Sequence, residues 1–159
     1  NYSYNGLLSQ LKRENVIGRM EASKALKAYL DDPKTIRTLK RSAVHDRSWF
    51  VRKAALESVA REMSPKDFLI AYIREKHSQP RRVIIAEMSK YYPDDAVKLI
   101  RKYLDTDDSY IVQAEMIRQL GSIGAQSDIK KIEFYKTQRS PRKILRNASV
   151  KALTTLKGN

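Results

Sequence analysis

Apolar side chains recur along this chain with the spacing of an amphipathic helix. In one segment they fall at every fourth position, at Val51, Ala55, Val59 and Met63. A helix with 3.6 residues per turn places such positions on one face, so we expect that face to be buried. Similar spacing begins near residues 36, 68, 97 and 129, and no segment alternates apolar and polar positions as a half-buried strand does. The pattern predicts an all-α protein.

The helical pattern is also repeated. Segments 18–26, 51–59 and 145–153 each have Arg at the second position, a small residue at the fifth and an apolar residue at the ninth. The ninth position recurs at intervals of 29 to 33 residues, at Leu26, Val59, Tyr91, Leu120 and Leu153. This period predicts one repeat domain, 1–159, with units near 1–31, 32–63, 64–92, 93–124 and 125–159. We expect it to be a domain of a longer chain, because it starts at Asn1.

The third unit fits the repeat least well. It has Val83 in the position of Val51, but Ile84 follows where other units have Arg.

Proline and short polar residues mark the predicted helix starts. Pro33, Pro65 and Pro93 begin first helices, where a missing N–H costs nothing. One column just before the second helices holds Asp46, Ser78, Asp107 and Ser140. Such residues are preferred N-caps, so we expect each to cap its helix. We also expect Gly121 or Gly124 to end a helix in the left-handed conformation.

Two-helix units that cannot bury their apolar faces alone predict an α-solenoid of about five antiparallel helix pairs. The frame Asp-x-x-x-x-Val-Arg at residues 46–52 resembles the short HEAT-like repeat. The resemblance implies that the acid caps the second helix and that the Arg joins a polar ladder between units. It thereby implies structural roles for Arg19, Asp46, Arg52 and Asp107, with Gln113 as a variant. It also implies a right-handed, armadillo-type superhelix with the second helices on the inner face.

A narrower resemblance covers about a third of the chain. "NVIGRMEASKAL" (15–26) followed by "DRSWFVRKAALESVA" (46–60) is similar to the HEAT-like C-terminal region of zinc aminopeptidases of the aminopeptidase N family. The matching positions are Gly18, Arg19, Glu21, Ala22, Leu26, Asp46, Trp49, Phe50, Val51 and Arg52. This resemblance implies an accessory domain of a hydrolase that shapes substrate access. Its partners would be the parent chain's catalytic domain and the peptide substrate, and zinc would lie only in that absent catalytic domain.

The residues for catalysis or metal binding are missing from the sequence. There is no Cys, and the two histidines, His45 and His77, are not part of an H-E-x-x-H motif. We therefore expect no catalytic or metal-binding residue and no cofactor in this chain. The absence of Cys favours a cytoplasmic protein. The longest apolar runs, such as Phe68 to Ile73, are too short to span a bilayer, so no membrane partner is expected.

The net charge of +14 raises an alternative function, because the excess of Lys and Arg is spread through both halves of the chain. Basic residues recur at the starts of second helices, at Arg47, Lys53, Arg81, Arg82, Arg142, Lys143 and Arg146. Trp49 and Tyr110 share one column, where they could stack on bases or fill the seam between helices. The alternatives are a nucleic-acid-binding protein of the alkylpurine DNA glycosylase type and a free-standing scaffold that binds acidic proteins.

Overall fold

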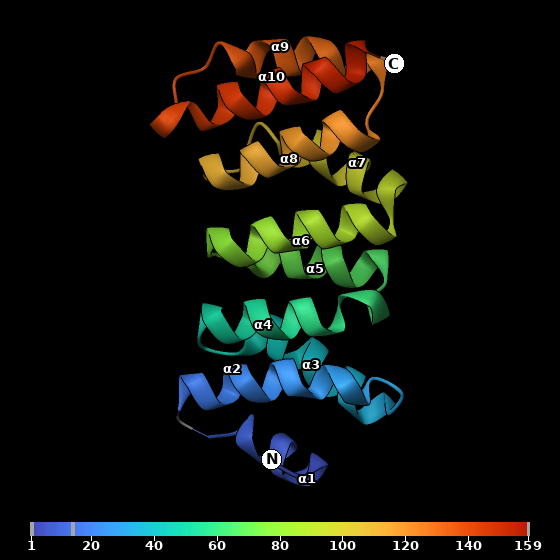
Figure 1. Ribbon diagram of the computed structural model, residues 1–159, viewed down its shortest axis with the longest axis vertical. Coiled ribbons are helices and arrows are strands. Elements are labelled where there is room, and N and C mark those ends of the chain that lie inside the picture. The colour runs from blue at the N-terminus through green and yellow to red at the C-terminus, as the bar shows by residue number, and fades with distance from the viewer. Residues whose placement is uncertain (1, 14, 159) are drawn as a thin grey trace. The chain divides into compact units, whose positions relative to one another are not determined.

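The computed structural model describes residues 2–13 and 15–158, and it confirms the all-α prediction (Figure 1). Those residues form α-helices and short 3₁₀ turns, and none lies in a strand. The α-helices are α1 (Tyr4–Gln10), α2 (Val16–Ala25), α3 (Pro33–His45), α4 (Trp49–Val59), α5 (Pro65–Arg74), α6 (Ser78–Tyr91), α7 (Pro93–Tyr103), α8 (Tyr110–Ile123), α9 (Ile129–Lys136) and α10 (Ile144–Lys157). The 3₁₀ turns are η1 (Leu26–Tyr29), η2 (Ala60–Glu62), η3 (Gln126–Asp128) and η4 (Pro141–Lys143).

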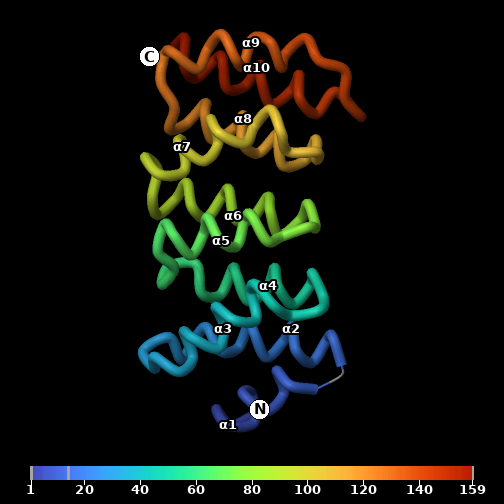
Figure 2. Tube along the Cα trace, turned by 180° about the vertical axis from the view of Figure 1, so that it is seen from behind, coloured from blue at the N-terminus to red at the C-terminus, as the bar shows by residue number. Residues whose placement is uncertain are grey.

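The chain divides into two compact units, with the division between Ile84 and Ile85 inside α6. Each unit is a stack of paired helices of the α-solenoid class. In the first unit, α4 packs on both α2 and α3. Figure 1 shows α2 and α4 in front of α3, and the reverse view in Figure 2 brings α3 and α5 forward. Its core includes Leu26, Leu39, Leu56 and Phe68, each at most 1% exposed.

In the second unit, α10 packs on both α8 and α9, and α7 packs on α8. The core here includes Met116, Ile117 and Ile132, all fully buried. The backbone of α8 lies close to α10 at Gly121, where an added Cβ would lie 2.8 Å from the Cβ of Ala152. Gly121 therefore lets α8 and α10 pack closely.

Gly124 does end α8, but the left-handed conformation predicted for a glycine there is wrong. Gly121 lies inside α8, and Gly124, the C-cap residue, has a φ of −79°. No described glycine has a positive φ; Arg142 (51°) and Lys143 (55°) are the described residues that do.

The predicted caps need correction at three positions. Asp46 and Asp107 are not N-caps, since Ser48 and Ser109 occupy those positions before α4 and α8. Asp46 Oδ1 instead accepts from the Ser48 N–H at 2.8 Å, and Asp107 Oδ1 from the Ser109 N–H at 2.9 Å. A carboxylate two residues ahead of such an N–H forms an Asx turn, which directs the chain into the helix.

The third position is Ser78, which is the first residue of α6 rather than the residue before it. The acid that precedes α6 is Glu75, whose Oε1 accepts from the His77 N–H at 3.0 Å. Ser140 does precede its helix, and its Oγ accepts from the Leu145 N–H at 3.0 Å.

The acid of the third unit is thus Glu75, three residues before the predicted Ser78, and the core positions of this unit shift by the same three residues. Met88 is 3% exposed, whereas Tyr91, the predicted core position, is 37% exposed. Ile84 is a core residue at 2% exposure, and the Arg of this unit is Arg81. The spacing of Arg81 from Glu75 equals that of Arg52 from Asp46, so the third unit has the frame of the second.

Candidate functional site

A ladder of arginines and acids links successive helix pairs in the first unit. Arg19 in α2 donates from Nε to Asp46 Oδ2 at 2.9 Å and from Nη2 to Asp46 Oδ1 at 3.2 Å. Its Nη1 donates to the backbone carbonyl of Arg13 at 2.8 Å. The Arg19 and Asp46 side chains are only 3% and 9% exposed. This bidentate geometry orients the turn before α4 relative to α2.

Arg52 repeats this arrangement one helix pair later. It donates to both carboxylate oxygens of Glu75 at 2.8 Å, and its Nη1 donates to the Asp46 carbonyl at 2.7 Å. Arg81 in turn donates from Nη1 to the carbonyls of Glu75 (3.4 Å) and Lys76 (2.8 Å). Sequence reasoning missed Glu75, and it placed Arg81 in the basic row instead of the ladder, because it aligned the third unit on Val83.

The second unit is held by different polar contacts. Gln113, in the Arg column, donates to the Leu104 carbonyl at 2.9 Å. Arg101 of α7 forms a bidentate pair with Asp128 of η3, with distances of 2.9 and 2.8 Å. The hydrogen bond from Arg101 and that from the Ala125 N–H hold the pKa of Asp128 below its ordinary value, against the effect of burial. The repeat pattern in the sequence does not reveal this pair, because neither Arg101 nor Asp128 lies at the Arg or acid position of the Asp-x-x-x-x-Val-Arg frame.

An aromatic cluster lies at the starts of α4 and α6, where the sequence suggested Trp49 alone. The Trp49 ring stacks on His77 with ring centres 4.2 Å apart and planes at 11°. It also stacks on Phe50, with ring centres 3.8 Å apart. Trp49 is half-buried, and Phe50 is 51% exposed. The cluster Trp49, Phe50 and His77 is therefore a supported aromatic surface open to solvent.

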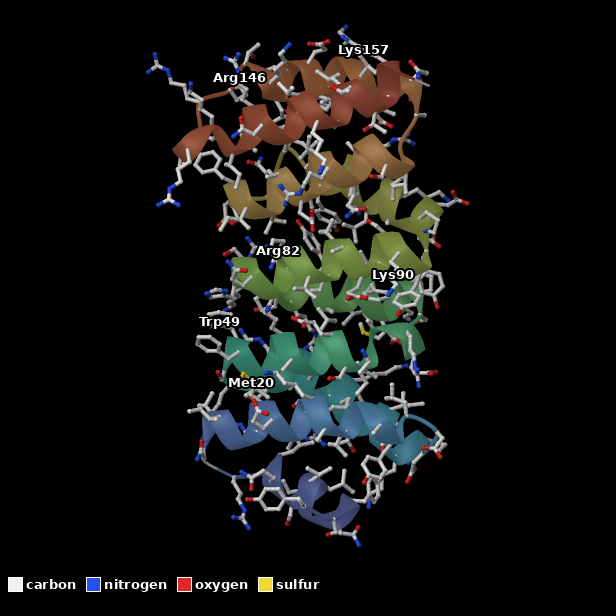
Figure 3. All side chains as sticks on the ribbon, viewed as in Figure 1. Met20, Trp49, Arg82, Lys90, Arg146 and Lys157 are labelled. Carbon is white, nitrogen blue, oxygen red and sulfur yellow. The ribbon has the colours of Figure 1, made fainter. Side chains whose placement is uncertain are left out.

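Figure 3 places Met20, Trp49 and Arg82 on the same side of the first unit, toward the starts of α2, α4 and α6. Of the basic residues predicted near this surface, Arg47 is exposed and Arg82 is half-buried. Arg82 Nε donates to Gln79 Oε1 at 3.4 Å, and its Nη1 and Nη2 have no hydrogen bond to any residue that the structure describes, so they can meet a ligand.

Two members of the predicted basic row are committed elsewhere. Arg81 is 7% exposed and belongs to the ladder, so it is not a surface cation as predicted. Lys53 pairs with Glu57 at 3.1 Å one turn along α4. The row in the first unit is thus less basic than the sequence indicated.

The remaining predicted site residues lie in the second unit. Tyr110, the first residue of α8, is 45% exposed, so it is not filling a helix seam. Arg142, Lys143 and Arg146 are exposed at the start of α10. Arg142 and Lys143 adopt left-handed backbone conformations there.

Within residues 2–13 and 15–158, no group of three or more His, Asp or Glu side chains has the arrangement of a metal site. Over the same ranges, no helix combines the length and apolar character that crossing a bilayer requires.

Comparison with known proteins gives one family match. A family model described as HEAT repeats matches residues 4–88, which is more than half of the chain. The matched range contains the ladder and the aromatic cluster. No curated protein matches the sequence significantly.

Proposed function

We propose a binding function for this chain, which belongs to the family of HEAT repeats. It is a non-catalytic domain that binds a protein or peptide segment through its aromatic cluster. Stacked helix pairs offer extended surfaces of this kind, and the family generally mediates protein interactions. The exposed aromatic cluster of Trp49, Phe50 and His77 is the observation that carries the proposal. Tryptophan is among the residues most enriched where binding energy concentrates in protein interfaces.

The cluster is rigidly supported. Trp49 lies between the ladder residues Asp46 and Arg52, and His77 follows Glu75 by two residues. Their ion pairs fix the turns that carry the rings, and stacking of Trp49 on His77 and Phe50 restricts the rings themselves, so less side-chain freedom is lost on binding. A preorganised surface of this type gains affinity because less ordering accompanies association.

The chemistry around the cluster indicates a partner segment with an apolar side chain next to a carboxylate. The face of Phe50 would accept the apolar group, while Arg47 and Arg82 supply positive charge nearby. Nucleic acid has less support. Its affinity depends on many cations contacting phosphates, and here Arg81 is buried and Lys53 is paired.

The parent protein that we propose is a zinc aminopeptidase of the aminopeptidase N family, in which this domain would shape peptide access. Arg19, Asp46 and Arg52 support that parentage weakly, because any stack with this ladder needs them. Trp49 and Phe50 are more specific, since stacking does not require a phenylalanine that is 51% exposed. An H-E-x-x-H motif upstream in the same reading frame would support the parentage, and a start codon directly before Asn1 would refute it.

Binding can be followed with Trp49, because it is the only tryptophan in the chain. The probe is a set of decapeptides with a free carboxylate and one Phe, Leu or Ala near the C-terminus. We expect Phe and Leu peptides to change the Trp49 emission, and we expect Phe50→Ala to weaken their binding about tenfold. Phe134→Ala is the matched control, because Phe134 is 54% exposed on α9. An unchanged emission with every peptide, or equal losses in the two variants, would refute this binding site.

A further inference from the structure

Two grooves flank α3 on the side of the first helices. One, of about 710 Å³, lies between α3 and the end of α1, and its lining includes Lys12, Arg37, Arg41 and His45. The other, of about 580 Å³, lies between α3 and α5, where Arg74 contributes from α5. Arg41 and His45 line both grooves, so α3 forms a ridge between them. None of the three residues of the aromatic cluster lines either groove.

The cations in these grooves exceed the acids available to them. Asp46 is the acid among the lining residues, and Arg19 already holds it. Lys40 is paired with Asp67 at 2.9 Å. By contrast, the side chains of Lys12, Arg41 and Arg74 form no hydrogen bond or ion pair within the part of the chain that the structure describes. Among the described residues, Lys12, Arg41 and Arg74 thus have no acid paired with them, which favours an anionic ligand.

The spacing of these groups along α3 suits an extended chain. Arg37, Arg41 and His45 follow one another at four-residue intervals, so they lie on one side of the helix over about 12 Å. A peptide in an extended conformation covers that distance with about four residues. Alternate side chains of such a peptide would point to the same side and meet successive basic groups.

The lining also distinguishes between anionic partners. Aliphatic side chains lie among the cations, with Leu8 and Leu11 in the first groove and Val44 and Ile70 in the second. No Phe, Tyr or Trp lines either groove, so there is no platform on which bases could stack. Mixed aliphatic and cationic walls match a peptide that carries both carboxylates and aliphatic side chains.

We propose that the α3 ridge and its two grooves bind an acidic, aliphatic segment of a partner protein in an extended conformation. Arg41 is the central contact because it lines both grooves, and Arg74 and Lys12 bind carboxylates on either side of the ridge. This site is separate from the aromatic cluster, because Trp49, Phe50 and His77 do not line either groove.

The test uses the whole 159-residue chain and a fluorescein-labelled octapeptide of alternating Glu and Leu, followed by anisotropy at low and moderate salt. We expect binding that weakens as salt rises, and we expect Arg41→Gln/Arg74→Gln to bind about tenfold more weakly. Both side chains are exposed, so circular dichroism should show an unchanged fold. Lys27→Gln/Lys151→Gln is the matched control, because it removes the same charge at two exposed positions outside the grooves.

Three outcomes would overturn the proposal. The first is equal weakening by the control pair, which would mean that only net charge matters. The second is loss of binding in Phe50→Ala, which would place the peptide on the aromatic cluster. The third is displacement of the peptide by a short DNA duplex at equimolar concentration, with the same dependence on Arg41 and Arg74, which would make the groove a nucleic-acid site.

Discussion

Arg52 and Glu75 form a bidentate ion pair in which two guanidinium nitrogens each lie 2.8 Å from a carboxylate oxygen. The Glu75 side chain is 3% exposed and the Arg52 side chain 17%. The hydrogen bonds that Arg52 donates to Glu75 outweigh burial and raise the pKa of Arg52 above its ordinary value. The pair joins α4 to the turn that precedes α6. Because both side chains are largely buried, each charge is stabilised mainly by the other in the folded state.

Replacing one partner of this pair should destabilise the protein strongly. Glu75→Gln leaves the Arg52 charge without its counter-ion, and we expect the free energy of unfolding in urea to fall by about 3 kcal/mol. The double variant Arg52→Met/Glu75→Leu should recover much of that loss, because neither charge remains. Glu62→Gln is the control: its pair with Arg61 is exposed, and we expect a change of about 0.5 kcal/mol or less. Equal effects of Glu75→Gln and Glu62→Gln would contradict a structural role for the ladder.

Acid should weaken the second unit through Asp128. Its pKa is lowered in the folded state by the hydrogen bond from Arg101, so its contribution to stability is complete above the ordinary pKa of 3.8. That contribution is lost as the pH falls through the lower, folded-state value. Asp128→Asn should therefore be less stable at neutral pH and show a flatter fall in stability below about pH 4. Asp31→Asn, at an exposed position, is the control and should keep the wild-type dependence of the free energy of unfolding on pH. Parallel pH curves for the wild type, Asp128→Asn and Asp31→Asn would exclude this role of Asp128.

Gly121→Ala should separate two helices of the second unit. The new Cβ would lie 2.7 Å from the Ala152 Cα and 2.8 Å from its Cβ, and a backbone atom cannot move aside alone. We expect a net loss of about 1–2 kcal/mol in thermal unfolding, because overpacking outweighs the helix propensity of Ala. Gly6→Ala has no neighbour nearer than 3.3 Å and should be neutral or stabilising. A more stable Gly121→Ala protein would show that the contact is easily relieved.

Lys143→Gly should stabilise the start of α10. Lys143 has a φ of 55°, a conformation that L side chains adopt at a cost and glycine adopts freely. We expect a gain of about 0.5–1 kcal/mol in the free energy of unfolding. Arg146→Gly, one turn further into the helix, should instead lose about 1 kcal/mol. If both variants lose stability equally, the left-handed conformation at Lys143 carries no strain.

The sequence predicted the fold class well because helix formation here depends on short-range patterns. Apolar residues four positions apart and prolines at helix starts are local signals, and Pro33, Pro65 and Pro93 do begin α3, α5 and α7. The register of the third unit could not be read in the same way. Val83 and Ile84 are both buried, so the apolar pattern alone fits two alignments. Glu75 settles the alignment through its ion pair with Arg52, which forms only in the folded chain.

The candidate site was less predictable than the fold. A tryptophan in a repeat column does not reveal that His77, 28 positions later, will stack on it. Likewise, Arg81 and Arg82 are adjacent and chemically identical in the sequence, yet Arg81 is buried while Arg82 reaches the surface. The difference comes from the direction in which each side chain leaves α6, which decides whether it meets backbone carbonyls or solvent.

The double use of Asp46 and Glu75 has a consequence for how the first unit unfolds. Each uses its carboxylate for the arginine of the preceding helix pair and its backbone carbonyl for the arginine that follows. Opening one turn therefore removes hydrogen bonds from both neighbouring turns at once. Amide hydrogens near residues 46 and 75 should accordingly exchange with solvent at similar rates, as parts of one cooperative segment and not as independent repeats.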